Sequence, residues 1–206
     1  MSIIRRGLCL VIAAPSGAGK TSLTHALIDR ETNLSQSVSV TTRPPRPGER
    51  EGVHYYFRDQ AEFDTMAQTG GLLEWAGVFG RSYGSPRAPV QAAIQAGHDI
   101  VLAIDWQGHR KVRTALPDDT VGVFLLPPSM AALESRLQTR ASDSAAEIAA
   151  RMAKARDEMS HAGEFDHVVV NDEFDRAVGQ VQAILNAARL ATPRQTGLAG
   201  FLAAFE

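Results

Sequence analysis

The chain has 206 residues, of which 44% are hydrophobic and 21% are charged. This size and composition suit one α/β domain with a substantial core, and they exclude a disordered, collagen-like or wholly coiled-coil chain. The net charge of -2 is far from that of a dedicated nucleic-acid binder. No apolar run approaches the roughly 20 residues of a membrane span, and the single cysteine, Cys9, cannot form an internal disulfide. We therefore expect a cytoplasmic protein with no nucleic-acid or membrane partner.

Short apolar runs alternate with longer amphipathic segments, a pattern typical of a largely parallel sheet covered by helices. The apolar runs predict central strands, and the segments between them predict helices. The predicted strands are 8–13, 100–104, 121–126 and 168–170, and the predicted helices are 21–28, 88–96, one capped by Ser129, 145–160 and 174–190. Gly97 is suited to end the helix before it. The segment after 191 predicts only a loose terminal helix.

The segment 38–57 breaks this alternation, because it reads as two short strands around a proline-rich loop. Within it, Arg43 and Arg46 would form an anion clamp if their guanidinium groups converge. In an arbitrary loop, such arginines simply face solvent. The segment predicts a small subdomain inserted into the α/β core.

A glycine-rich loop followed by a lysine and a threonine lies between the first predicted strand and the first predicted helix. This is the context of a P-loop, in which backbone N–H groups and a helix N-terminus surround a phosphate. Lys20 is expected to reach the β- and γ-phosphates of a nucleotide, and the Thr21 hydroxyl to ligate Mg²⁺. The motif departs from its usual form at its first position, which is Ala14 rather than glycine. The predicted ATP-binding residues here are Ala14, Pro15, Ser16, Gly17, Ala18, Gly19, Lys20, Thr21 and Ser22.

A P-loop alone leaves motors, GTPases, ATPases and kinases open, and further motifs narrow the choice. VSVTTRPPRPGE at 38–49 and HYYF at 54–57 are followed by LEWA at 73–76, YGS at 83–85, IDWQG at 104–108, FLLPPS at 124–129 and VVVND at 168–172. In this order they resemble the guanylate kinases, specifically the bacterial ones, from about residue 7 to 190. The resemblance implies a P-loop NTPase fold, with a mostly parallel central sheet flanked by helices, an inserted GMP-binding subdomain and a mobile lid. The implied activity is phosphorylation of GMP by ATP with Mg²⁺.

The resemblance also implies roles for individual residues. The acceptor phosphate is expected on Arg43, Arg46, Tyr55 and Tyr83, and the guanine base on Ser39, Glu74, Ser85 and Asp105. Carboxylates suit guanine, because its N1–H and amine donate and an ionised carboxylate only accepts. Catalytic roles fall to Lys20, Arg43, Arg136, Arg140 and Arg151, the last three in the lid, and an adenine contact falls to Asn171. Where many relatives carry an acidic residue, this chain has Ala103, so Thr21 and the ATP phosphates are expected to hold Mg²⁺ alone.

The expected organisation is one guanylate kinase-like domain. Its core covers about 1–37, 91–135 and 160–191, the GMP-binding insert 38–90, the lid 136–159 and the tail 192–206. Two alternatives stay open: a P-loop kinase with another acceptor, such as a ribose bisphosphate, and a catalytically silent binding module. The sequence leaves the choice between monomer and homo-oligomer undetermined.

Overall fold

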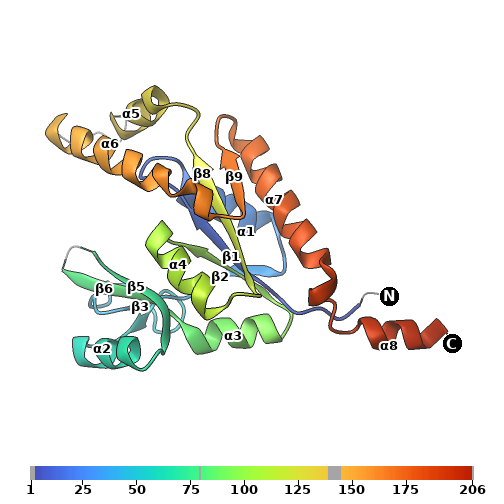
Figure 1. Cartoon of the computed structure of the whole chain (residues 1–206). Coiled ribbons are helices and arrows are strands. Elements are labelled where there is room, and N and C mark those ends of the chain that lie inside the picture. Colours follow the sequence, from blue (N-terminus) through green and yellow to red (C-terminus); the bar gives the residue numbers. More distant parts are fainter. Residues whose placement is uncertain (1–2, 79, 139–144, 206) are drawn as a thin grey trace.

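A five-stranded sheet forms the centre of the computed structural model, which describes residues 3–78, 80–138 and 145–205 (Figure 1). The strand order is β2-β7-β1-β8-β9, and every pairing is parallel. The strands are β1 (Cys9–Ala13), β2 (Leu34–Gln36), β7 (Asp99–Ala103), β8 (Thr120–Leu126) and β9 (His167–Val170). The predicted fold class and four of these strands are confirmed, whereas β2 is a short edge strand that the sequence analysis did not predict.

Helices cover both faces of this sheet, as the continuous apolar character of β1 requires. Leu8, Leu10 and Ile12 face a core shared with α1 (Lys20–Arg30) and α7 (Phe174–Leu190). The intervening residues of β1 face a second core with α3 (Arg87–Gln95) and α4 (Trp106–Ala115). Cys9 lies in the second core, where burial raises the pKa of its thiol to about 12 and keeps it unreactive.

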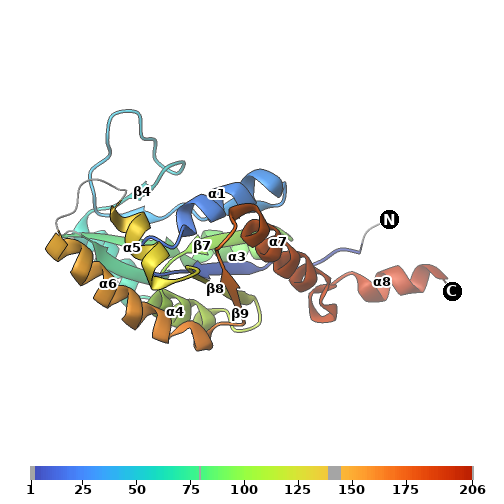
Figure 2. The same cartoon turned by 90° about the horizontal axis from the view of Figure 1, so that it is seen from above.

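A second, four-stranded sheet has the order β4-β3-β6-β5. It comprises β3 (Val40–Thr41), β4 (Tyr56–Phe57), β5 (Leu72–Val78) and β6 (Arg81–Pro86). The helix α2 (Gln60–Gln68) packs on it through Phe63, which meets Val40 and Leu72. The two short strands around the proline-rich loop are confirmed, and Figure 2 shows that loop standing out from the body. The hairpin β5–β6 and α2 were not predicted.

Two further helices, α5 (Met130–Gln138) and α6 (Ala145–Ser160), pack on each other near the P-loop. The Ser129 hydroxyl accepts the Ala132 N–H at 3.1 Å and caps α5, as predicted. The predicted bounds of α6 and α7 agree with the structure. A 3₁₀ turn (Ala162–Glu164) then leads from α6 into β9.

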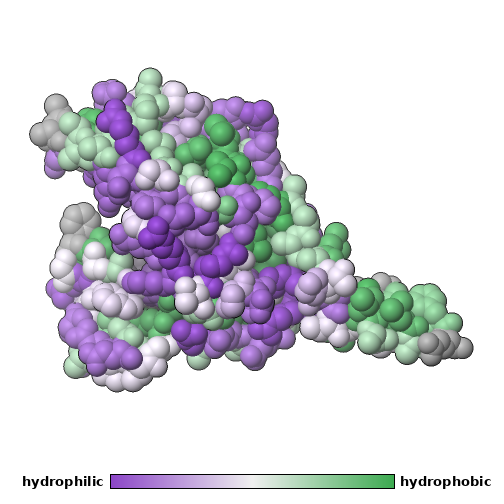
Figure 3. Space-filling model, viewed as in Figure 1, coloured by the Kyte–Doolittle hydropathy of each residue, from purple (hydrophilic) through white to green (hydrophobic). Residues whose placement is uncertain are grey.

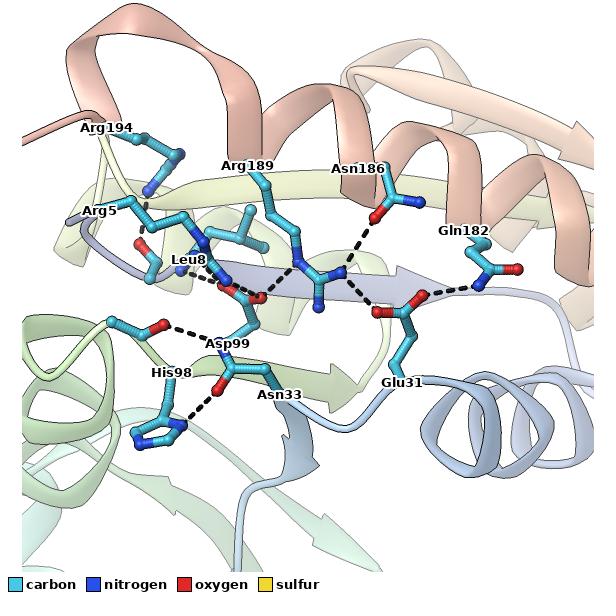
Figure 4. A network of polar contacts seen from close by, with 12 residues as sticks. Arg5, Leu8, Glu31, Asn33, His98, Asp99, Gln182, Asn186, Arg189 and Arg194 are labelled. Carbon is cyan, nitrogen blue, oxygen red and sulfur yellow. Dashed lines mark hydrogen bonds and ion pairs between the residues drawn. The ribbon is translucent and has the colours of Figure 1, made fainter. Parts of the chain in front are cut away.

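A buried carboxylate fastens the start of the chain to α7 (Figure 4). Asp99, which is fully buried, accepts two hydrogen bonds from Arg5 at 2.8 Å, one from the Leu8 N–H at 3.0 Å and one from Arg189 at 2.7 Å. Arg189 also donates to Glu31 at 2.5 Å. These contacts join the first residue of β7, the helix α7 and Glu31, the residue that ends α1, at the amino end of the sheet.

The segment after α7 forms a 3₁₀ turn (Thr192–Arg194), the short helix α8 (Leu198–Leu202) and a last turn (Ala203–Phe205). Both views show α8 projecting from the body, in keeping with the weak pattern of this segment (Figures 1 and 2). In the described part of the chain, no helix is long and apolar enough to cross a membrane.

Candidate active site

The P-loop lies where the sheet offers a ligand site. From β1 the chain turns to β2 on one side, and after β7 it crosses to β8 on the other, so that the carboxyl end of β1 is a switch point. Gly17 and Gly19 have φ of 91° and 95°, a conformation that glycine adopts without strain. No side chain caps the N-terminus of α1 and its first turn holds no acidic residue, so its backbone N–H groups can meet an anion.

Lys20 is held at the carboxyl end of β7. Its Nζ donates to the Ile104 carbonyl at 2.9 Å, and burial lowers the pKa of its ammonium group. The nearby charges of Asp105, Glu158 and Glu74 oppose that lowering. The side chain of Lys20 therefore extends from the P-loop to the segment after β7 that contains Asp105.

Asn171 is buried under the P-loop. Its side-chain Nδ2 donates to the Ala18 carbonyl at 2.8 Å. The backbone carbonyl of Asn171 accepts a hydrogen bond from the Arg136 guanidinium at 3.0 Å. A Cβ on Gly19 would lie 2.6 Å from that Nδ2, so the close approach itself requires glycine there. The structure thus gives Asn171 a contact with the loop, and its contact with adenine stays a prediction.

A cleft of about 300 Å³ connects the P-loop lysine with the second sheet. Figure 3 shows this side of the molecule hollowed between α6 and the four-stranded sheet. Ala103 is one of its lining residues. Six of the predicted site residues line it, namely Lys20, Ser39, Glu74, Tyr83, Ser85 and Asp105.

Three of the four residues predicted for the guanine base, namely Glu74, Ser85 and Asp105, lie together on one wall of this cleft. The Ser85 hydroxyl donates to Glu74 Oε1 at 2.7 Å across the paired strands β5 and β6. Glu74 is 8% exposed, and burial raises the pKa of its carboxyl, with the charge of Asp105 acting in the same direction. Asp105 caps α4 by accepting the Gly108 N–H at 2.7 Å. The site therefore presents two carboxylates, one of them nearly dry.

The residues predicted for the acceptor phosphate are only partly brought together. The Arg43 guanidinium lies 5.3 Å from the Tyr55 ring centre, which is 6.1 Å from that of Tyr83. Glu49 accepts from Arg43 at 2.7 and 3.0 Å and from the Arg46 N–H at 2.7 Å. The Arg46 side chain is exposed, and the Arg43 guanidinium pairs with Glu49. The structure therefore does not show the two guanidinium groups converging as the predicted anion clamp requires. Sequence analysis gave Glu49 no role, although a carboxylate among arginines is a signal of such pairing.

Of the predicted lid arginines, Arg136 contacts the end of β9 through Asn171, and Arg151 lies half-buried on α6. Arg140 falls outside the described residues. Sequence analysis also missed Glu158 on α6, whose Oε2 accepts the Ser16 N–H of the P-loop at 3.2 Å.

The donor set at the start of α1 fits Mg²⁺ held mainly by substrate. Thr21 is exposed in the first turn of α1 and offers one hydroxyl oxygen. Among the described residues, no group of three or more His, Cys, Asp or Glu side chains could hold a metal ion. Mg²⁺ usually keeps several waters and takes phosphate oxygens, so a single threonine hydroxyl is compatible with the predicted ion, which stays a prediction.

A P-loop at the switch point of a parallel sheet, with a lysine facing an acidic cleft on an inserted sheet, defines a phosphotransferase of the P-loop NTPase fold. Comparisons with known proteins narrow this class to one family. Residues 6–188 match the model of the guanylate kinase family. The guanylate kinase of Gluconobacter oxydans is 61% identical over 98% of this chain and 97% of its own, and that of Granulibacter bethesdensis 59% identical over 96% and 92%. The crystal structure of guanylate kinase from Anaplasma phagocytophilum, 35% identical, aligns with a TM-score of 0.74 over 98% of this chain and 96% of that one.

The chain belongs to the guanylate kinase family, and it is a kinase. The resemblance seen in the sequence motifs is confirmed.

Proposed function

We propose that the chain transfers the γ-phosphoryl group of ATP to GMP, giving ADP and GDP, and that it accepts dGMP in the same way. One observation carries this proposal: the buried carboxylate of Glu74, held by Ser85 beside Asp105, shares a cleft with the P-loop lysine. A base-reading wall and a phosphate-binding lysine in one cleft are what transfer between two nucleotides needs.

The wall matches guanine in hydrogen-bonding character. Guanine offers N1–H and an exocyclic amine as donors, and the ionised Glu74 and Asp105 offer only acceptors. Ser39, at the edge of the cleft, adds a hydroxyl. None of the residues assigned to GMP is assigned to the 2′-hydroxyl of its ribose. We therefore propose dGMP, which lacks this hydroxyl, as a second substrate.

The acceptor phosphate would lie near Tyr83, where Arg43 and Tyr55 converge. Arg43 would exchange its contact with Glu49 for the phosphate, and the exposed Arg46 would swing towards it. Such charge-assisted pairs are the stronger class of hydrogen bonds.

Transfer would proceed in line. An oxygen of the GMP phosphate forms a bond to the γ-phosphorus as the bond to the bridging oxygen of ADP breaks. The chain has no covalent chemistry to perform, so its residues position the two phosphates and neutralise their charge. That role falls to Lys20 in the P-loop and to the arginines of the lid, Arg136, Arg140 and Arg151. Mg²⁺, held by Thr21 and the ATP phosphates, would supply further neutralisation.

A test is to incubate the purified protein with ATP, Mg²⁺ and GMP and to quantify nucleotides by chromatography. We expect ADP and GDP in equal amounts, and neither when GMP or Mg²⁺ is left out. Chiral γ-thiophosphate should be transferred with a single inversion at phosphorus. A silent binding module would bind GMP and form no GDP, and a kinase for another acceptor would ignore GMP. The cytoplasm, where these nucleotides are made and used, is the compartment we propose.

A further inference from the structure

The last turn of α6 contacts the P-loop through one side chain. Glu158 Oε2 accepts the Ser16 N–H at 3.2 Å, 142 residues away in sequence. Its other oxygen lies 3.7 Å from the ammonium group of Lys154, one turn earlier on the same helix. The Glu158 side chain is only 13% exposed, although it comes from a helix whose neighbouring residue, Asp157, faces solvent. A carboxylate directed at a loop amide in this way is placed by packing rather than left in water.

The contact uses the Ser16 amide and not an amide of the first turn of α1. The Ala18 N–H is already used by the Pro15 carbonyl at 3.1 Å, which closes a turn, and the Ser16 N–H is used by Glu158. The uncapped first turn of α1, beginning at Lys20, remains directed at a phosphate. Glu158 therefore contacts the loop without capping the amides at the start of α1.

α5 and α6 reach the loop as one unit. Leu133 and Leu137 of α5 pack with Met152 of α6. A Cβ on Gly17 would lie 3.0 Å from both leucines, so the loop rests directly on α5. Apolar contact supports the loop from α5, and the hydrogen bond of Glu158 fixes its rim from α6.

We propose that Glu158 is a positioning residue of the ATP site, which fixes the P-loop through the Ser16 N–H and couples α6 to it. The proposal deepens the function proposed above and rests on it, since α6 belongs to the predicted lid.

Three variants separate this role from a general effect of charge. Glu158→Ala removes the acceptor. Glu158→Gln keeps an acceptor oxygen of the same reach, and Asp157→Asn removes the same charge from the exposed neighbour. Binding of the non-hydrolysable ATP analogue AMP-PNP with Mg²⁺, measured by calorimetry, should weaken roughly tenfold in Glu158→Ala, as expected for losing a hydrogen bond to a charged group at a partly exposed site. It should be nearly unchanged in the other two variants, and GMP binding should be unchanged in all three.

Amide hydrogen exchange gives a readout that needs no acceptor nucleotide. The Ser16 amide should exchange faster in Glu158→Ala than in the wild type, and keep its protection in Glu158→Gln and Asp157→Asn. If Glu158→Ala does not fold, Glu158→Asp replaces it, because the shorter side chain keeps the charge and loses reach. Unchanged exchange with unchanged affinity, or tighter binding of AMP-PNP through loss of a competing anion, would overturn the proposal. Failure of the chain to phosphorylate GMP would leave both readouts intact.

Discussion

Replacing Glu74 by glutamine should weaken recognition of GMP and strengthen the fold. In the structure, Glu74 is 8% exposed and accepts one hydrogen bond, from Ser85. Glutamine keeps the shape and an acceptor for Ser85, but it turns a charged acceptor into a neutral amide that also donates. The amide would meet a guanine donor with a donor of its own, or with a weaker acceptor.

The size of the effect on GMP follows from the loss of one charged, buried hydrogen bond. Such bonds contribute about 1.5–3 kcal/mol, which corresponds to a fall of about 10- to 150-fold in kcat/KM for GMP. The KM for ATP should change little, because Glu74 lies on the inserted sheet and the P-loop on the core. At low pH the wild type should approach the variant. Burial raises the pKa of Glu74, so its carboxyl is protonated at a higher pH than an ordinary glutamate.

The effect on stability has the opposite sign. A pKa raised in the folded state means that the folded chain binds the proton more tightly than the unfolded chain does. The stability gained in this way is present below the ordinary glutamate pKa and is lost as pH rises through the raised pKa of Glu74. At neutral pH the wild type therefore holds a costly buried charge. Glu74→Gln should raise the free energy of unfolding there and lose that advantage in acid.

Steady-state kinetics with varied GMP or ATP, together with urea unfolding at pH 7.5 and pH 4.5, measure both effects. Glu173→Gln is the matched control, because Glu173 is exposed at the start of α7 and its side chain makes no capping bond. Intact GMP kinetics in Glu74→Gln would refute the guanine-reading role. A variant less stable than the wild type at neutral pH would refute the assignment of a costly buried charge.

Three other substitutions test other parts of the site and the fold. Lys20→Ala should lower kcat by several orders of magnitude, as loss of a charge-stabilising group worth roughly 3–7 kcal/mol predicts, and leave GMP binding intact by calorimetry; near-normal turnover would remove Lys20 from the mechanism. Arg43→Ala should raise the KM for GMP at least about tenfold and that for ATP little, because Arg43 lies with Tyr55 in the loop between β3 and β4, beside the inserted sheet. Equal changes in both KM values would place Arg43 outside the acceptor site. Asp99→Asn should lower the free energy of unfolding in urea by roughly 3–5 kcal/mol, because Arg5 and Arg189 lose their buried partner; a loss below about 1 kcal/mol would mean that the network in Figure 4 contributes little.

The elements predicted from sequence are those whose residues are apolar at a regular spacing. β1 is buried on both faces, and α7 carries Ala177, Val178, Val181 and Leu185 on its buried side. The missed elements lack this signal. β6 contains Arg81 and has no regular apolar spacing, and it becomes a strand through pairing with β5 on one side and β3 on the other. α2 could have been found, because Asp59 and Glu62 form a capping box that is visible as a motif.

For the site, local motifs predicted the P-loop, and the resemblance predicted the cleft residues that the fold brings together. Contacts between distant segments could not be predicted in this way. The pairing of Glu158 with Ser16 depends on how α6 packs, and the pairing of Arg43 with Glu49 depends on the shape of the proline-rich loop. In both pairs the partner of the carboxylate, Glu158 or Glu49, is determined by the tertiary structure and not by a local sequence motif.

The most direct test of the proposed function is the ratio of kcat/KM for GMP, IMP and AMP with the wild-type protein. AMP presents an acceptor at N1 and lacks the 2-amine, so at least one carboxylate of the cleft would face it unpaired. IMP keeps N1–H and loses only the amine. Sites built on such pairing discriminate by roughly 10⁴-fold, so we predict that GMP exceeds AMP by that order and that IMP lies between them. Phosphorylation of AMP as efficient as that of GMP would contradict the role assigned to Glu74 and Asp105.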